Sequence, residues 1–362
     1  QHTSMYIMPP PDTLNPVVDI AMDSHGRIWT AIYVGYLGVG GVAMWDGNQW
    51  IDFTSTIFVV NCGHGHPHMV KAIAEESDKL LHSYLYPTEI KARFLDKLIG
   101  ATPDYLEKAL LFCTGTEASE RAVMLARHHG LRKGPDCNII VGGEMNYHGF
   151  TMGSLMAGGI ASLREWVGYQ DPGMVQTPFP YPWELEKITP KKLLNKCLKK
   201  LKKKIDLKKD ICGFMLETFQ GWGAIFYPKE FVKEIANLCK QNKILLSFDE
   251  MQAGFGRTGE LFGYMNYDVT PDLIACGKGA SSSLPLSMVL GSKKIMDLPE
   301  IGSMSSTHSA NPMVCAAGLA NMKAIIEDGI LENSKILGKV FQLKLEELKN
   351  RYKDYIFHIF LK

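Results

Sequence analysis

The sequence predicts an α/β fold, in which helices flank the strands of a sheet. From about residue 70, stretches with helical spacing alternate along the chain with short apolar runs. Such runs, bounded by turn residues, are typical of strands that are buried on both faces. The chain has 362 residues, which is enough for a sizeable core and two domains. Its 46% apolar and 21% charged residues are ordinary for a globular protein.

The elements follow in chain order from these patterns. Helical spacing covers residues 70–84, 117–128 and, with an interruption near Gly329, 310–353. The lysine-rich stretch 187–209 also has helical spacing, and we expect a surface helix there rather than a nucleic-acid patch. The predicted strands are residues 109–113, 138–142, 211–216, 244–248, 272–276, 288–290 and 355–362. These patterns do not determine the order of the strands in the sheet.

The first 45 or so residues have a different pattern. Residues 17–29 alternate between apolar and polar and contain a turn at Ser24-His25-Gly26, and a second aromatic turn covers residues 45–50. This segment resembles one blade of a β-propeller. Because one blade cannot close a ring, we expect a hairpin-rich N-terminal arm.

Charge and composition argue against several classes of partner. The net charge of +1 does not provide the excess of basic residues that binding to nucleic acid or an anionic membrane requires. No apolar run reaches the roughly 18–20 residues of a membrane span. The first residues lack an apolar signal-peptide core.

The eight cysteines form no C-x-x-C pair, and several lie in apolar runs, so we expect reduced thiols in a cytoplasmic protein. His64, His66 and His68 have no carboxylate or cysteine at ligand spacing, so we predict no metal site.

Two polar residues directly follow predicted strands, where open α/β sheets bind ligands. Asp249 follows the run 244–248, and a buried carboxylate there is costly unless a cation pairs with it. Lys278 follows the run 272–276 and lies between two glycines, which leave room for a bulky group at the lysine. The simpler alternatives are a helix N-cap for Asp249 and an ordinary loop lysine for Lys278.

Two further segments complete a chemical set. Thr114-Gly115-Thr116-Glu117 opens a predicted helix, and its free N–H groups suit a phosphate, although Thr114 and Glu117 also have capping-box spacing. Tyr147, beyond the run 138–142, could stack on a flat ring, and a core tyrosine is the usual alternative. In chain order the segments supply a phosphate cradle, an aromatic, an acid and a lysine. Pyridoxal phosphate (PLP) requires this set.

The sequence resembles the class III PLP-dependent aminotransferases, the group that contains ornithine, acetylornithine and 4-aminobutyrate aminotransferases. The resemblance runs from about Gly41 to the end of the chain. Its most specific feature is the acid segment 248–259 followed by the lysine segment 276–279. Further matching segments are residues 61–67, 115–118, 147–149 and 306–312.

The resemblance implies a PLP-dependent transferase fold of type I. Its large domain has a mixed but mostly parallel sheet flanked by helices, and its small α+β domain is incomplete here. The implied parts are an N-terminal arm with part of the small domain at 1–60, a large PLP-binding domain at 61–308 and the start of a truncated small domain at 309–362. The N-terminal arm does not resemble the opening helix of the family.

The resemblance also implies a role for each matching residue. Asp249 would pair with the ring nitrogen of the cofactor, and Lys278 would form a Schiff base with it and later transfer a proton. Thr307 would reach the cofactor of a neighbouring subunit, which implies a homodimer. The residues that would bind the phosphate, stack on the ring or lie beside the cofactor are Gly115, Thr116, Tyr147, His148, Glu217 and Gln252.

The implied activity is ping-pong transamination from an amino acid or amine to a keto acid or aldehyde. Decarboxylation of a dialkyl amino acid, an aminomutase reaction and a PLP-binding fragment without activity are the alternatives. The sequence departs from the family pattern in three places: Thr218 stands where proline is usual, Trp222 stands where some members place a glutamate that gates a substrate-binding arginine, and Ser309 and Ala310 replace a common glycine pair. The substrate therefore stays open.

Overall fold

A computed structural model describes residues 17–34, 39–45, 47–48, 50–199, 201, 205–221 and 223–353. The chain forms two compact units, Gln1–Val60 and Asn61–Lys362. Within the described ranges no helix combines the length and the hydropathy that crossing a membrane requires. The predicted strand at 355–362 and the departure from the family pattern at Trp222 fall outside these ranges.

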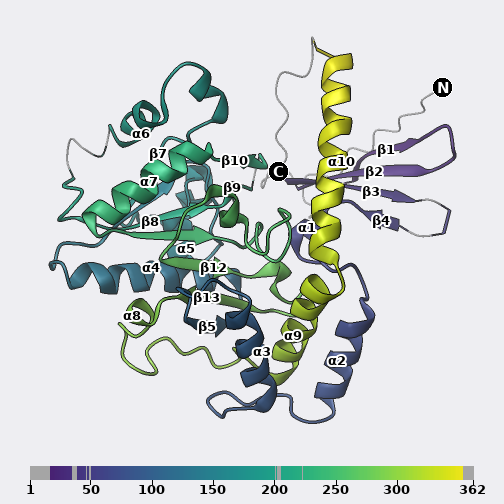
Figure 1. Cartoon of the computed structure of the whole chain (residues 1–362), viewed down its shortest axis with the longest axis horizontal. Helices are drawn as coiled ribbons and strands as arrows, with labels where there is room; N and C mark the ends of the chain where they lie inside the picture. The colour runs from purple at the N-terminus through teal and green to yellow at the C-terminus, as the bar shows by residue number, and fades with distance from the viewer. Residues whose placement is uncertain are drawn as a thin grey trace. The chain divides into compact units, whose positions relative to one another are not determined.

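The first unit contains an antiparallel sheet in the order β1-β2-β3-β4 (Figure 1). Its strands are β1 (Val17–Met22), β2 (Ile28–Val34), β3 (Val39–Trp45) and β4 (Trp50–Asp52). Asp23 organises the turn between β1 and β2, because its carboxylate accepts hydrogen bonds from the backbone N–H of His25 and from Nε1 of Trp29. The alternating sequence thus forms consecutive hairpins, with a tight turn at Gly26, where the sequence predicts one.

The second unit is built on a sheet that, among the described residues, has the strand order β5-β13-β12-β11-β8-β6-β7. All its strands run in one direction except β13, which is antiparallel to both neighbours. The predicted α/β class with a mixed, mostly parallel sheet is therefore confirmed. The strands are β5 (Lys108–Phe112), β6 (Ile139–Gly143), β7 (Met174–Thr177), β8 (Ile211–Glu217), β11 (Leu245–Asp249), β12 (Leu273–Cys276) and β13 (Ser287–Gly291).

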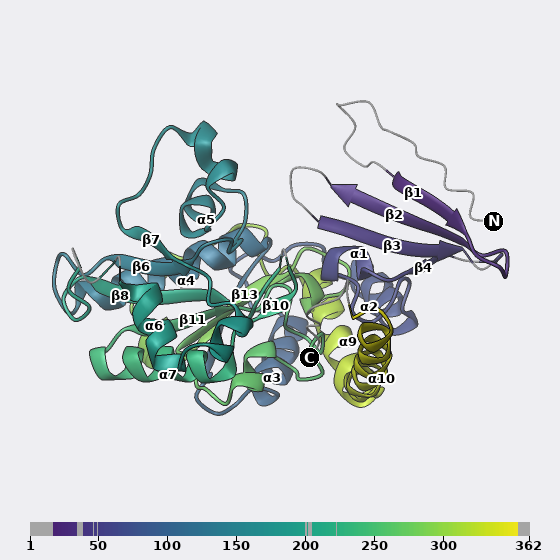
Figure 2. The same cartoon turned by 90° about the horizontal axis from the view of Figure 1, so that it is seen from above.

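Helices cover both faces of this sheet, with α4 (Gly115–Leu131) on one face and α7 (Lys229–Asn242) on the other (Figure 2). Successive side chains of a strand point to opposite faces. Along β12, Ala275 therefore joins the core under α4, and Ile274 joins the core under α7. Burial on both sides explains why the strands read as continuous apolar runs in the sequence.

Three more helices pack together beside the sheet: α2 (Pro67–Ser77) and α3 (Glu89–Gly100) both contact α9 (Pro312–Glu327). Gly329, with φ of 78°, separates α9 from α10 (Ile330–Arg351), at the interruption that the sequence predicts. Within the lysine-rich stretch, residues 190–198 form α6 (Pro190–Leu198), which buries its leucines as a surface helix does.

The remaining elements are short. They are α1 (Ser55–Phe58), α5 (Met152–Ala157), α8 (Lys293–Met296), β9 (Phe219–Gln220), β10 (Ile225–Phe226) and the 3-10 helices η2 (Ala161–Val167), η3 (Pro182–Glu186), η5 (Gly263–Tyr267) and η6 (Lys278–Ala280). Of these, η6 directly follows β12 and carries the lysine that the sequence singles out.

Gly130 lies where α4 packs most closely on the sheet. A Cβ at this position would be 1.9 Å from the carbonyl oxygen of Cys137 and 2.6 Å from Cβ of Cys212, neither of which can move freely. We expect Gly130→Ala to lower the free energy of unfolding by about 3 kcal/mol, measured by urea denaturation. Gly100→Ala is the matched control, because Gly100 is also in a helix and nothing lies within 4 Å of its Cβ position. Equal losses in both variants would contradict the steric explanation.

Candidate active site

The start of α4 and the carboxyl ends of β6, β8, β11 and β12 border a cavity of about 250 Å³. Parallel strands bring their carboxyl ends to one edge of a sheet, so polar residues that follow them in sequence meet there. Eight of the nine site residues that the sequence predicts line this cavity, and Thr307 does not. The eight are Gly115, Thr116, Tyr147, His148, Glu217, Asp249, Gln252 and Lys278.

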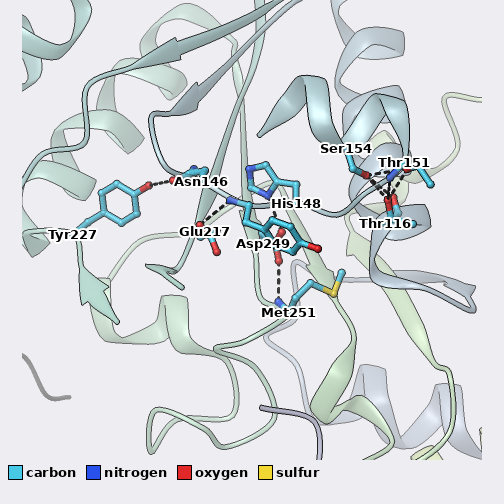
Figure 3. A network of polar contacts seen from close by, with 10 residues as sticks. Thr116, Asn146, His148, Thr151, Ser154, Glu217, Tyr227, Asp249 and Met251 are labelled. Atoms are coloured by element: carbon cyan, nitrogen blue, oxygen red, sulfur yellow. Dashed lines mark hydrogen bonds and ion pairs between the residues drawn. The ribbon is translucent and has the colours of Figure 1, made fainter. Parts of the chain in front are cut away.

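Asp249 ends β11 and forms a buried pair with His148 (Figure 3). Its Oδ2 lies 2.7 Å from Nδ1 of His148, and its Oδ1 accepts a hydrogen bond of 2.9 Å from the backbone N–H of Met251. Since a carboxylate oxygen only accepts, Nδ1 of the histidine carries the proton. Two donors therefore hold the carboxylate in place where it lines the cavity. Sequence reasoning placed His148 near the cofactor but missed its pairing with Asp249.

Glu217 ends β8 and fixes the loop that carries Tyr147. Its Oε2 accepts a hydrogen bond of 3.0 Å from the backbone N–H of Tyr147. Burial, together with the neighbouring charge of Asp249, raises the pKa of Glu217 well above its ordinary value. The ring of Tyr147 lines the cavity and packs edge-on against Phe150, with the ring centroids 5.5 Å apart. Glu217 thus helps to fix the position of Tyr147 by binding the backbone of that residue.

The start of α4 forms the capping box that the sequence suggests. Oγ1 of Thr114 accepts from the backbone N–H of Glu117, and Oε2 of Glu117 accepts from that of Thr114 at 2.8 Å. The first N–H groups of a helix have no partner within the helix, so this end still suits an anion. Oγ1 of Thr116 lies 2.6 Å from the hydroxyls of both Thr151 and Ser154 (Figure 3). These two hydroxyls were not evident from the sequence.

Lys278 begins η6 with φ of 44°, in the left-handed region. The structure adds a second reason for the two flanking glycines, beyond the room at the lysine that the sequence suggests. A Cβ at Gly277 would be 2.6 Å from Sδ of Met251, and one at Gly279 would be 2.2 Å from Nδ2 of Asn61. The glycines therefore permit close packing around the turn, and the side chain of Lys278 lines the cavity.

Thr307 lies outside the cavity and is exposed. Its backbone carbonyl accepts a hydrogen bond of 2.9 Å from Nε2 of His82. Gln252, in contrast, lines the cavity, and its Oε1 is buried with no hydrogen-bond partner among the described residues.

No cluster of three or more His, Cys, Asp or Glu side chains that could hold a metal is found in the described part of the chain. His68, from the histidine group, pairs with Asp328 at 3.0 Å.

The cavity fits PLP by its chemistry. The helix start can bind a phosphate, the tyrosine ring offers a stacking surface, the buried carboxylate can pair with a ring nitrogen, and the lysine can bind an aldehyde. In addition, Nε2 of His148 and Oε1 of Gln252 are buried without a partner in the described structure, which is costly unless a ligand supplies one. The fold and the cavity together define the class of PLP enzymes.

Comparison with known proteins identifies the family, aminotransferase class-III, which matches residues 38–359. The chain is 32% identical over 318 residues to a probable 4-aminobutyrate aminotransferase of Bacillus subtilis (strain 168), covering 85% of this chain and 71% of the relative. It is 33% identical over 337 residues to an acetylornithine aminotransferase of Caldanaerobacter subterraneus subsp. tengcongensis, covering 92% and 79%.

A taurine:2-oxoglutarate aminotransferase from Bifidobacterium kashiwanohense, solved in complex with PLP and glutamate, has a similar structure. The TM-score is 0.76 at 26% identity, over 86% of this chain and 72% of that one. The chain belongs to the class III aminotransferases. The predicted family, the PLP cofactor and transamination as the type of reaction are thereby confirmed.

Glu250, beside Asp249, is a second buried carboxyl, with an exposed fraction of 0%. It accepts hydrogen bonds from the backbone N–H groups of Gly263 and Tyr264, both at 2.7 Å, and from the hydroxyl of Thr218. Proline, which is usual in the family at position 218, could not supply this hydroxyl. Burial raises the pKa of Glu250 from its ordinary 4.5 to about 7.

This raised pKa predicts how stability depends on pH. The folded protein holds the proton of Glu250 more tightly than the unfolded chain, so this stabilisation is complete below pH 4.5 and is lost as the pH rises through 7. In Glu250→Gln we expect the loss of unfolding free energy between these pH values to be smaller by about 3 kcal/mol. Urea denaturation at a series of pH values measures it. Glu260→Gln, at a partly exposed carboxylate paired with Lys335, should keep the wild-type pH dependence. An unchanged dependence in Glu250→Gln would contradict the assignment.

Proposed function

We propose that the cavity is the PLP site of a transaminase that moves an amino group from an amino acid or amine to a keto acid or aldehyde. The observation that carries this proposal is the convergence of Lys278, the buried Asp249–His148 pair and the start of α4 on a single cavity. These groups come from distant parts of the chain, and each has a separate use with this cofactor.

When bound, PLP supplies an electron sink that stabilises negative charge on the substrate carbon. Asp249, held by the N–H groups of His148 and Met251, keeps a proton on the ring nitrogen of the cofactor. Nζ of Lys278 would attach the cofactor and, once released, would take the proton from the substrate carbon and deliver it to the cofactor carbon.

The other lining residues bind and orient. The N–H groups of Gly115 and Thr116 at the positive end of the α4 dipole bind the phosphate. Tyr147, whose backbone is fixed by Glu217, stacks on the ring. Gln252 donates or accepts at the ring hydroxyl from its place in the cavity wall.

A single-turnover experiment tests this function. The purified protein is loaded with PLP and mixed with an amino donor in the absence of an acceptor. A transaminase releases about one equivalent of keto product per site and no carbon dioxide, and a keto acid or aldehyde then restores the original visible spectrum. Carbon dioxide release would favour decarboxylation instead, and retained PLP without turnover of a broad donor panel would favour a binding role.

The exposed position of Thr307 supports a homodimer in which this residue completes the site of the other copy. Sedimentation measures the oligomeric state. Mixing Lys278→Ala and Thr307→Ala proteins tests the contribution in trans. A hybrid dimer then has one site with both residues intact, so activity should rise on mixing. No gain from verified hybrids would place Thr307 in its own chain's site or outside any site.

A cytoplasmic location is supported by the cysteines, because all eight are free thiols in the structure. Burial raises the pKa of several of them, Cys239 and Cys276 included, which keeps these thiols protonated and unreactive. Fractionation of the source cells tests this proposal, since an extracellular location would contradict it.

A further inference from the structure

Asn321 is a fully buried polar residue of α9, with an exposed fraction of 0%. Its Nδ2 donates hydrogen bonds to the backbone carbonyls of Gly279 at 2.8 Å and Ala280 at 3.0 Å. Its Oδ1 accepts a hydrogen bond of 2.6 Å from the hydroxyl of Ser282, and the thiol of Cys62 lies 3.1 Å from the same atom. With acceptors on one side and donors on the other, the orientation of the amide is determined.

The two carbonyls belong to the turn that carries Lys278. A residue with a Cβ pays about 1–2 kcal/mol in the left-handed conformation, and Lys278 has φ of 44°. Strained residues of this kind persist only where the surroundings hold them. Within the turn, the N–H of Ala280 bonds to the carbonyl of Gly277 at 2.9 Å. The two bonds from Asn321 add a restraint from a separate helix.

The surroundings of Asn321 on α9 are otherwise apolar, since Ala317, Met322 and Ile325 belong to the buried core. An apolar residue at 321 would suit this core better, but it would leave the two carbonyls of the turn and the hydroxyl of Ser282 without a partner. The polar residue is therefore explained by the turn that it binds, and not by the packing of the helix.

We propose that Asn321 is a positioning residue for Lys278. It holds residues 278–280 in the turn from which the lysine side chain enters the cavity, and it does so without contacting the cavity. The inference rests on the proposal that Lys278 attaches the cofactor, and it adds a residue outside the site on which that attachment depends.

The test compares Asn321→Leu, which has the same number of side-chain heavy atoms and the same branching but cannot donate, with Ser282→Ala. The control removes the donor to Oδ1 but leaves both bonds to the carbonyls. The first readout is hydrogen exchange of the amides of residues 277–283 in the cofactor-free protein. The second is the rate at which added PLP and borohydride label Lys278, located by peptide mapping. In Asn321→Leu we expect faster exchange in this segment and about fivefold slower labelling, the effect of roughly one net hydrogen bond. Ser282→Ala should label at the wild-type rate.

The possible outcomes distinguish a failure of the positioning role of Asn321 from a failure of cofactor attachment at Lys278. Labelling of folded Asn321→Leu at the wild-type rate would overturn the positioning role, even if the melting temperature falls. Equal slowing in Ser282→Ala would overturn it too, because the carbonyl bonds remain there. Failure to label Lys278 in the wild type would instead overturn the cofactor attachment. Where Asn321→Leu gives no folded protein, Asn321→Ser provides the same comparison, since a serine hydroxyl is too short to bridge both carbonyls.

Discussion

Lys278→Ala is expected to remove the visible absorption of the lysine-bound cofactor and to lower transaminase activity by about 10⁴- to 10⁶-fold, as the loss of a nucleophile does in other covalent enzymes. The reason is that Lys278 lines the cavity, where the proposed function gives it two tasks, attachment and proton transfer. Absorbance spectra, a coupled assay and borohydride labelling with peptide mapping measure these losses.

Lys294→Ala is the matched control for this variant, because Lys294 is exposed on α8. It should retain absorbance, labelling and activity. Labelling that persists at another lysine of Lys278→Ala would show that the cofactor is attached elsewhere. Circular dichroism of the cofactor-free variant checks that the fold is unchanged, so that a loss of folding is not mistaken for a loss of chemistry.

Asp249→Asn is expected to lower kcat/KM by about 10²- to 10³-fold, since neutralising one partner of a buried ion pair costs roughly 3–5 kcal/mol. Asparagine keeps the shape and can still accept from the N–H of Met251, but it lacks the charge that holds a proton on the cofactor ring. The measurements are steady-state kinetics and the spectrum of the PLP-loaded protein, in which the change of ring protonation should shift the absorption.

Asp268→Asn provides the comparison for Asp249→Asn, because Asp268 is an exposed aspartate paired with Lys229 and Lys233. Exposed pairs contribute little, and asparagine tolerates the left-handed conformation of this residue, so kinetics and spectrum should stay as in the wild type. An Asp249→Asn enzyme with wild-type kinetics would show that the carboxylate does not meet the cofactor.

The fold class and the position of the site could be predicted because they depend on local patterns. Strands buried on both faces read as apolar runs, and the residues after them meet at one edge of a parallel sheet. The run before Asp249 and the run before Lys278 are adjacent strands, β11 and β12, so these two residues lie on neighbouring strand ends. The family motif then identified the same residues from independent information.

Other features depend on contacts between distant residues and could not be predicted. Strand β7 is only partly buried and lacks a clear apolar run, so its pattern does not stand out. The antiparallel insertion of β13 leaves no trace in periodicity. The predicted helix over 70–84 instead begins at Pro67, which suits a first helical position, and ends at Ser77. Asn321 was missed because its partners are 41 and 42 positions away in the chain.

The bonds from Asn321 also bear on how the chain can be divided for expression. A fragment of residues 61–308 would keep every residue proposed to contact the cofactor, and sequence motifs alone would recommend it. Such a fragment loses α9, however, and with it both carbonyl bonds to the lysine turn and the packing against α2 and α3. The smallest piece able to hold its lysine ready for the cofactor therefore extends at least through Glu327, the last residue of α9.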